Sequence, residues 1–166
     1  QYGEYSFQGE TSKLDIVEKL ISGNYYYRKL IIPECSSIKE ILDIVDNNIF
    51  LIGNISKTPS EGTIFPDTYF FQRDDDKNII ISRMQKKMDK VVGSIWRKDN
   101  ELLQSQGDLI NLASLIEAEA KDNLEKYTIS SVFYNRIKKE MKLQSDPTIL
   151  YYKNLKNKIK TKKIFK

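Results

Sequence analysis

Histidine does not occur in this chain of 166 residues, and cysteine occurs only once, at Cys35. The lack of histidine excludes a Ser–His–Asp triad, a Cys–His dyad and any zinc site built on histidine. A single cysteine excludes an intramolecular disulfide. Carboxylates, the hydroxyls of Ser, Thr and Tyr, and lysines remain for chemistry.

Long hydrophobic runs are also lacking. No stretch of 18 or more apolar residues occurs, so the sequence predicts no membrane-spanning helix, and no signal peptide is visible. The chain is 40% hydrophobic, which is enough to form a core, and its 30% of charged residues suit a folded domain with a polar surface.

The net charge of +4 comes from the end of the chain, because residues 151–166 contain seven lysines and no acidic residue. Such a segment can contact an anionic polymer or surface, although a solvated terminus is the favoured interpretation. Nucleic-acid binding is a weaker alternative, because no nucleic-acid-binding motif accompanies the lysines. We therefore expect no nucleic-acid partner.

The residue pattern predicts an α+β protein that is mainly helical after residue 75. Glycine and proline cluster in residues 53–68, which are expected to form a loop or junction. Strands are expected over 4–8 and 25–32, and helices over 12–22, from Ser36 or Ser37 onward, and over 79–99, 108–122 and 127–140.

Apolar residues at helical spacing predict which helix faces are buried. For the first helix these residues are Leu14, Val17, Leu20 and Ile21, with Gly23 as the stop. For the later helices they are Ile38, Ile41, Leu42 and Val45; Ile80, Met84, Met88, Val91, Val92 and Ile95; and Ile129, Val132, Phe133 and Ile137.

The stretch LASLIEAEA, residues 112–120, carries two carboxylates on an otherwise apolar helix. On a helical wheel of about 100° per residue, Glu117 and Glu119 lie on opposite flanks of the apolar stripe, about 160° apart. Both can be flanking residues whose carboxylates reach outward toward Lys121 or Lys126.

The alternative is that one of these carboxyls has a chemical role. A carboxyl held against apolar side chains is harder to ionise, and can then serve as a general acid. Glu119 lies between the large side chains of Leu112 and Leu115, so it is the better candidate for this role. Glu117 is then expected to be structural, or to orient a neighbouring group.

Two further clusters contain polar groups that suit a sugar, which presents many hydroxyls to amides, guanidinium groups and carboxylates. A helix end with turn residues, or aromatic side chains that close the core, would produce similar clusters. The clusters are NRIKKEMKLQSDP, with Asn135, Arg136, Gln144, Ser145 and Asp146, and EGTIFPDTYFF, with Glu61, Asp67, Thr68 and Tyr69.

Three stretches taken together resemble the YceG/MltG-like endolytic transglycosylases of bacterial cell walls. They are EGTIFPDTY (61–69), LASLIEAEA (112–120) and SSVFYNRIKKEMKLQSDPTILY (130–151), and they meet the family pattern nearly position by position. GEYSF, TSKLDIVEKLISG and IIPECSSIKEIL also look like the LysM-like subdomain of this family. The usual glycine after IPE is Cys35 here.

The resemblance implies a small LysM-like β/α subdomain over residues 1–52. A YceG-like catalytic domain over residues 53–166 follows, and is expected to be incomplete at its C-terminal end. It also implies an N-terminal membrane helix that lies outside this sequence, and a location outside the cytoplasmic membrane. The expected partners are peptidoglycan glycan strands and proteins of cell-wall synthesis.

Proteins of this family cleave the MurNAc–GlcNAc β-1,4 bond of nascent peptidoglycan without water and leave a 1,6-anhydro end. One glutamate suffices in principle, first as acid and then as base, so the resemblance implies that neither a metal nor a cofactor is needed, which agrees with the lack of histidine. The resemblance assigns this role to Glu119, the second glutamate of the E-x-E pair. It places Glu117 as a companion, and Glu61, Asn135, Gln144 and Asp146 as residues that line the cleft.

Two departures from the family pattern point to an alternative function with little or no catalytic activity. The family commonly has Glu-Arg shortly after the E-x-E pair, where this chain has Glu125 and Lys126, so a bidentate guanidinium is lost. The chain also turns lysine-rich and stops by Lys166, where family members continue. The alternative is a catalytically weak or inactive module that binds glycan or a wall-synthesis partner. A hydrolase that uses both glutamates is a further alternative, disfavoured by their separation around the helix.

Overall fold

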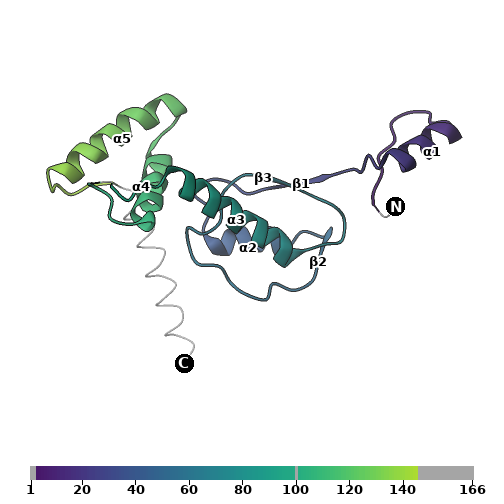
Figure 1. Cartoon of the computed structure of the whole chain (residues 1–166), viewed down its shortest axis with the longest axis horizontal. Helices are drawn as coiled ribbons and strands as arrows, with labels where there is room; N and C mark the ends of the chain where they lie inside the picture. The colour runs from purple at the N-terminus through teal and green to yellow at the C-terminus, as the bar shows by residue number, and fades with distance from the viewer. Residues whose placement is uncertain (1–2, 100, 146–166) are drawn as a thin grey trace. The chain divides into compact units, whose positions relative to one another are not determined.

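The computed structural model describes residues 3–99 and 101–145, and divides into two compact units, Gln1–Val91 and Val92–Lys166. The order of elements is α1-β1-α2-β2-β3-β4-α3-α4-α5 (Figure 1). Helices and two small sheets confirm the α+β prediction. Residues 53–91 pack with the N-terminal unit, while the assignment of residues 1–52 to a LysM-like subdomain stays a prediction.

The first helix, α1 (Lys13–Ser22), has the ends that its sequence predicts. Ser12 and Asp15 form a reciprocal capping box, and Gly23 stops the helix in the left-handed region at φ 67°. The expected burial of its apolar face is wrong for the described residues, because Leu14 and Ile21 are both 74% exposed. None of the residues of α1 is buried in the described part of the chain, so its ends are set by local capping signals and not by a buried face.

The segment before α1 differs from the prediction. Residues 4–8 form no strand; a single backbone hydrogen bond, from Tyr26 N to Glu4 O at 2.7 Å, joins them to the chain near β1. The Arg28 guanidinium donates to both carboxylate oxygens of Glu4, at 2.8 and 2.7 Å, and this lowers the pKa of Glu4. Side-chain pairing thus takes the place of the expected strand ladder.

The larger sheet pairs β1 (Arg28–Ile31) with β3 (Thr68–Phe71) in antiparallel register, with Lys29 opposite Phe70 and Leu30 opposite Tyr69. Side chains alternate between two faces in a strand, so Leu30, Tyr69 and Phe71 enter the core while Lys29 and Phe70 remain outside. The first strand was expected. The second begins where the expected 53–68 loop ends, at the β-prone residues TYFF.

The turn after β1 contains the single cysteine. Cys35 has φ 58°, in the left-handed region that glycine adopts without steric cost. The backbone therefore keeps the conformation expected for the family's glycine, although a side chain is present. The helix α2 (Ile38–Asp46) then begins at its cap, Ser37, whose hydroxyl accepts from Glu40 N.

The core of the N-terminal unit lies between the larger sheet, α2 and α3 (Lys77–Ile95). The expected inner faces are confirmed for Ile41, Val45, Ile80 and Met84, whereas Ile95 is 57% exposed. The buried residues of this core are Leu30, Ile32, Ile41, Val45, Leu51, Ile64, Tyr69, Phe71, Ile80, Ile81 and Met84.

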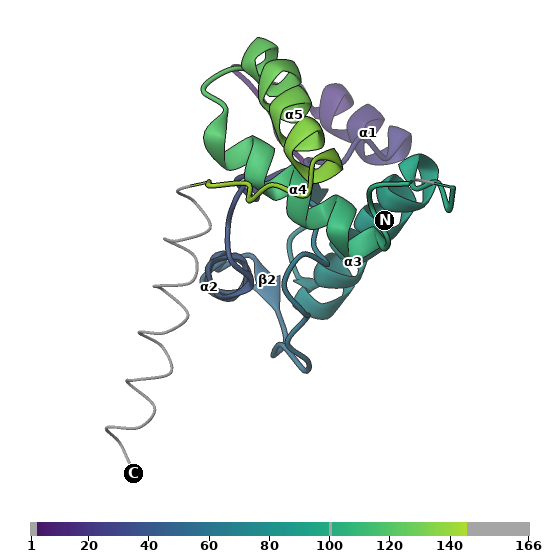
Figure 2. The same ribbon diagram turned by 90° about the vertical axis from the view of Figure 1, so that its left-hand side faces the viewer.

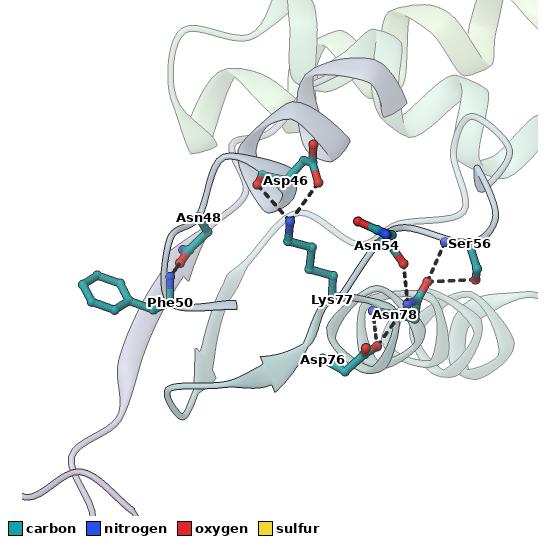
Figure 3. Close-up of polar contacts among 8 residues, drawn as sticks. All are labelled: Asp46, Asn48, Phe50, Asn54, Ser56, Asp76, Lys77 and Asn78. Carbon is teal, nitrogen blue, oxygen red and sulfur yellow. Dashed lines mark hydrogen bonds and ion pairs between the residues drawn. The ribbon is translucent and has the colours of Figure 1, made fainter. Parts of the chain in front are cut away.

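Polar contacts at the start of α3 join it to the small parallel sheet of β2 (Leu51–Ile52) and β4 (Asp75–Asp76) (Figure 3). Asp76 Oδ1 accepts from Asn78 Nδ2 at 3.1 Å, from Asn78 N at 2.7 Å and from Ile79 N at 3.3 Å. These hydrogen bonds, the one from the Asn78 side chain first, lower the pKa of Asp76. Lys77 Nζ reaches Asp46 O and Oδ1 at 3.0 and 2.8 Å. These bonds occupy backbone groups that are otherwise unpaired at helix ends.

The C-terminal unit contains α4 (Gln106–Glu119) and α5 (Asn123–Lys138), which pack against each other (Figures 1 and 2). Ser105 and Asp122 cap the two helices. The buried residues of its apolar cluster are Leu103, Leu112 and Phe133; Ile129 and Ile137 pack on them as expected, whereas Val132 is 43% exposed. In the described residues, no helix combines the length and hydropathy that a bilayer crossing requires.

Candidate functional site

The best candidate site is at the end of α4, where Glu119 is the last helical residue. Ala120 follows with extended angles, φ −77° and ψ 134°, and ends the helix about two turns after the buried Leu112. The Glu119 side chain is half-buried, and its Oε1 accepts a hydrogen bond of 2.5 Å from Ser145 Oγ. This contact joins two sequence motifs that are separated by 26 positions.

Ser145 is 3% exposed and is the buried polar residue of the described chain. Gln144, just before it, has φ 53°, in the left-handed region that costs a non-glycine residue energy. The Arg136 side chain, from α5, donates to Leu143 O, and Met141 N donates to Arg136 O at 2.8 Å. The last turn of α5 and the segment after it thus hold the serine hydroxyl against Glu119.

Glu117 occupies a different environment on the same helix. Lys126 Nζ lies 2.8 Å from its Oε1 and 2.7 Å from its Oε2, and both side chains are about one-third exposed. The expected outward contact with Lys126 is therefore confirmed. The Lys121 alternative is not seen, since Lys121 donates through its backbone N to Glu125 Oε2 at 2.9 Å. A pair this exposed adds about 1 kcal/mol or less to stability.

The other residues predicted to line the cleft do not all belong to the same unit. Gln144 and Asn135 are exposed and belong to the C-terminal unit, Gln144 directly beside Ser145 and Asn135 in the last turn of α5. Glu61 belongs to the N-terminal unit, where its Oε2 accepts from Ile38 N at 3.0 Å and so contributes to the start of α2. Asp146 lies outside the described residues.

The contact of Ser145 with Glu119 is not predicted from the sequence, in which Ser145 is only one polar residue of the LQSDP cluster. Its place between Gln144 and Asp146, two residues predicted to line the cleft, is the one signal for it in the sequence. In the described residues, no group of three or more carboxylates or thiols is placed to hold a metal ion. The expectation that no metal or cofactor is needed stays a prediction.

The arrangement supports acid–base chemistry by one carboxyl. Ser145 holds Oε1, and in the described part of the chain no hydrogen bond is recorded to Oε2. A carboxyl with one oxygen held by a hydrogen bond can give a proton to a substrate through the other oxygen and take one back. Leu112 is buried on the same face of α4 as Glu119, and Leu115 and Ile116 pack on its cluster, so this face of the helix is apolar.

Comparison with known proteins places the chain in a family. The sequence profile of the YceG-like family matches residues 1–165. The endolytic murein transglycosylase of Bacillus subtilis is 42% identical over 115 residues, which is 68% of this chain and 31% of that protein. The protein of the same name from Streptococcus pneumoniae D39 is 33% identical over 91 residues, 55% of this chain and 16% of that protein.

A crystal structure of a YceG-like protein from Listeria monocytogenes is also similar. It aligns with 85% of this chain and 57% of its own, with a TM-score of 0.53 and 29% sequence identity. The chain thus spans less than a third of the length of these two curated relatives. With a family match over nearly its whole length, the chain belongs to the YceG-like family and is related to endolytic murein transglycosylases.

Proposed function

We propose that this chain carries the catalytic glutamate of an endolytic lytic transglycosylase that cleaves the MurNAc–GlcNAc β-1,4 bond of peptidoglycan. The observation that supports the proposal is the contact between Glu119 and the buried Ser145. Two motif blocks of the family meet there, and the contact leaves a single half-buried carboxyl positioned for proton transfer.

The reaction requires one group that acts twice. Glu119 in its acid form donates a proton to the glycosidic oxygen as the bond from that oxygen to the muramoyl anomeric carbon breaks. The muramoyl 6-hydroxyl oxygen then bonds to the same carbon, and its proton passes to the Glu119 carboxylate. The products are a GlcNAc 4-hydroxyl and a 1,6-anhydro-MurNAc end, and the acid is restored without water.

A hydrolase that used both glutamates would need two carboxyls across one bond. Glu117 instead forms an ion pair with Lys126, while Glu119 bonds to Ser145. Because the two carboxyls have different partners on different flanks of α4, the single-glutamate mechanism accounts better for the geometry. Glu117 then fixes α4 against α5.

The wider setting follows from the family relationship. We infer that the substrate is a nascent glycan strand, that the protein acts outside the cytoplasmic membrane, and that an N-terminal helix beyond this sequence anchors it. Proteins of cell-wall synthesis are the expected partners. These inferences rest on relatives named endolytic murein transglycosylase, of which this chain spans only part.

The test is product analysis on purified, uncrosslinked glycan strands. The wild-type chain should produce 1,6-anhydro-muramoyl ends, and Glu119→Gln should reduce their rate at least about a thousandfold, since the amide cannot transfer a proton. Glu117→Gln is the matched control on the same helix, and should retain most of the activity. Products with reducing MurNAc ends would instead indicate a hydrolase.

The second candidate is a glycan-binding module without appreciable catalysis. Lys126 supports it, because the family's arginine at this place is replaced by a residue that pairs with Glu117 through a single ammonium group. If wild type and Glu119→Gln bind strands equally and neither cuts them, the binding module is the correct description.

A further inference from the structure

A second polar feature lies in the N-terminal unit, whereas Glu119 belongs to the C-terminal unit. An open hollow of about 360 Å³ is bounded by β3 and α3. Its lining contains aromatic and cationic residues and no acidic one: Thr68, Tyr69, Phe70, Arg83, Lys86 and Lys87. A shallow hollow of this kind suits one group of a larger polymer better than it suits a wholly enclosed small ligand.

The cations come from one face of α3. Arg83, Lys86, Lys87 and Lys90 follow a spacing of three and four residues, so they fall within about 100° of the helix surface. Asp89 falls about 120° from Arg83 and lies outside this arc. The face therefore presents concentrated positive charge along several turns.

Two of these cations already have partners that fix their positions. Arg83 donates through Nη2 to Phe70 O at 2.9 Å, and Lys87 pairs with Asp67 while its Nζ lies 5.7 Å from the Tyr69 ring centre. Lys86 and Lys90 form no ion pair with any carboxylate that the structure describes. Positive charge thus remains uncompensated at the hollow.

Phe70 forms an aromatic surface beside these charges. It is 49% exposed on the outer face of the β1–β3 sheet, and Lys29, its cross-strand partner, has Nζ 5.9 Å from the ring centre. Exposed aromatic rings pack against sugar faces, and a cation nearby can contact a negative group on the same ligand. An aromatic ring flanked by lysine and arginine therefore suits a ligand that combines an apolar sugar face with an oxyanion.

We propose that this hollow is a second binding subsite, which holds a carboxylate of the peptide stem on a glycan strand while Phe70 packs against an adjacent sugar. The choice of a peptide stem rests on the proposed function, because only a wall-derived strand combines sugars with frequent carboxylates in the setting inferred above. Phosphate is the other oxyanion that lysine and arginine bind well, and it could arrive as a free ion or on a lipid headgroup.

The probe is the disaccharide peptide GlcNAc–MurNAc-tripeptide, titrated against the full 166-residue chain by calorimetry at low and at physiological salt. This probe contains no MurNAc–GlcNAc bond, so binding is measured without cleavage. We expect Lys86→Glu to weaken binding at least about tenfold, the loss of one charge-assisted contact, and the affinity to fall as salt rises.

The matched control is Lys57→Glu, a charge reversal at an exposed lysine outside the hollow. It should leave the affinity within about twofold. Arg83→Lys keeps the charge but removes the planar guanidinium group, which can donate two parallel hydrogen bonds. It should weaken binding less than Lys86→Glu does. Lys86 makes no ion pair with a described carboxylate, so Lys86→Glu should leave the thermal midpoint of unfolding unchanged. An unchanged midpoint would show that the loss of affinity does not come from loss of the fold.

Three further probes distinguish the ligand classes. Chitotetraose has sugars but no carboxylate, and its binding should not change in Lys86→Glu. If inorganic phosphate competes with the disaccharide peptide at equal concentration, or if phosphatidylglycerol vesicles bind with the same dependence on Lys86, the peptide-stem assignment is overturned. It is also overturned if Lys86→Glu and Lys57→Glu bind the disaccharide peptide equally.

The two proposals fail separately. Binding that depends on Lys86 without anhydro ends would contradict the proposed catalysis and leave the subsite standing. Anhydro ends from a chain whose affinity for the disaccharide peptide does not depend on Lys86 would support the proposed catalysis and contradict the subsite. Glu119→Gln, tested with the same disaccharide peptide, should bind as the wild type does.

Discussion

The two compact units differ in how many apolar side chains hold them together. The N-terminal unit buries eleven hydrophobic residues in one cluster, with Val45, Ile80 and Met84 wholly enclosed. The cluster of the C-terminal unit contains three buried residues, Leu103, Leu112 and Phe133, in the part that the structure describes. Buried apolar area is the main source of stability, so we expect the unit that carries Glu119 to open more readily than the other.

The polar residues differ in a parallel way. In the N-terminal unit, Glu61 and Asp76 accept from backbone N–H groups at helix starts, which is a structural task. In the C-terminal unit, the buried Ser145 donates instead to the carboxyl of Glu119. Both units use polar groups to cap helices, but the C-terminal unit also has a buried hydroxyl that fixes the carboxyl of Glu119.

Truncation of one buried side chain in each unit tests this comparison. These two variants should have the largest effect on stability. Met84→Ala and Phe133→Ala each remove a buried side chain, at 0% and 5% exposure, and each should destabilise its own unit by about 3 kcal/mol. Hydrogen exchange should accelerate in β1, α2 and β3 for Met84→Ala, and in α4 and α5 for Phe133→Ala.

The exposed Ile79→Ala, at 60% exposure, is the control, and should change exchange little. If both core variants accelerate exchange throughout the described chain, the units unfold together and the comparison is wrong.

Removal of the Ser145 hydroxyl should affect chemistry more than folding. In Ser145→Ala the Glu119 carboxyl loses its fixed partner, and the rate of anhydro-end formation should fall about tenfold, equivalent to one charge-assisted hydrogen bond. Ser114→Ala is the control on the same helix, because its hydroxyl bonds only to Ile110 O in α4. Equal rates for the two variants would show that the Ser145 contact does not position the acid.

Acid should weaken the polar junction at the start of α3. The folded-state pKa of Asp76 lies below its ordinary value of 3.8, chiefly through the hydrogen bond with the Asn78 side chain, so its ionisation favours folding above that pH. This contribution disappears as the pH falls through the folded-state pKa.

Thermal melts of the wild type and of Asp76→Asn, from pH 6 downward, should therefore converge in acid. The wild-type midpoint should be the higher one at pH 6 and should fall more steeply below about pH 4. Parallel curves over this range would contradict the role of the Asp76 charge.

The smallest effect is expected at the turn after β1. Cys35 holds a left-handed φ of 58°, which a side chain disfavours. Cys35→Gly should relieve that strain and stabilise the N-terminal unit by about 0.5–1 kcal/mol, after the entropy that glycine adds to the unfolded chain is subtracted. Cys35→Ala keeps a Cβ and should not gain stability. Urea unfolding followed by fluorescence of the aromatic residues compares the three.

Much of the local structure was predictable because its signals are local. Ser12, Ser37 and Ser105 each cap a helix with an acidic residue three positions later, and the pattern can be read directly from the chain. The strand over 4–8 failed for the opposite reason. A strand needs a partner ladder, and here the pairing of Glu4 with Arg28 replaced it.

The sequence by itself determined the helices and their caps and excluded histidine chemistry. From the positions of Glu117 and Glu119 around α4, it also predicts Glu119 as the better candidate for an acid. Only the tertiary structure decided that Ser145 meets Glu119, that Glu117 is paired with Lys126, and that Glu61 serves the start of α2. The physical reason is the separation, along the sequence, of the residues that make each contact. Caps and helical faces depend on residues within four positions of each other, whereas contacts across 9, 23 or 26 positions depend on how the helices and loops pack.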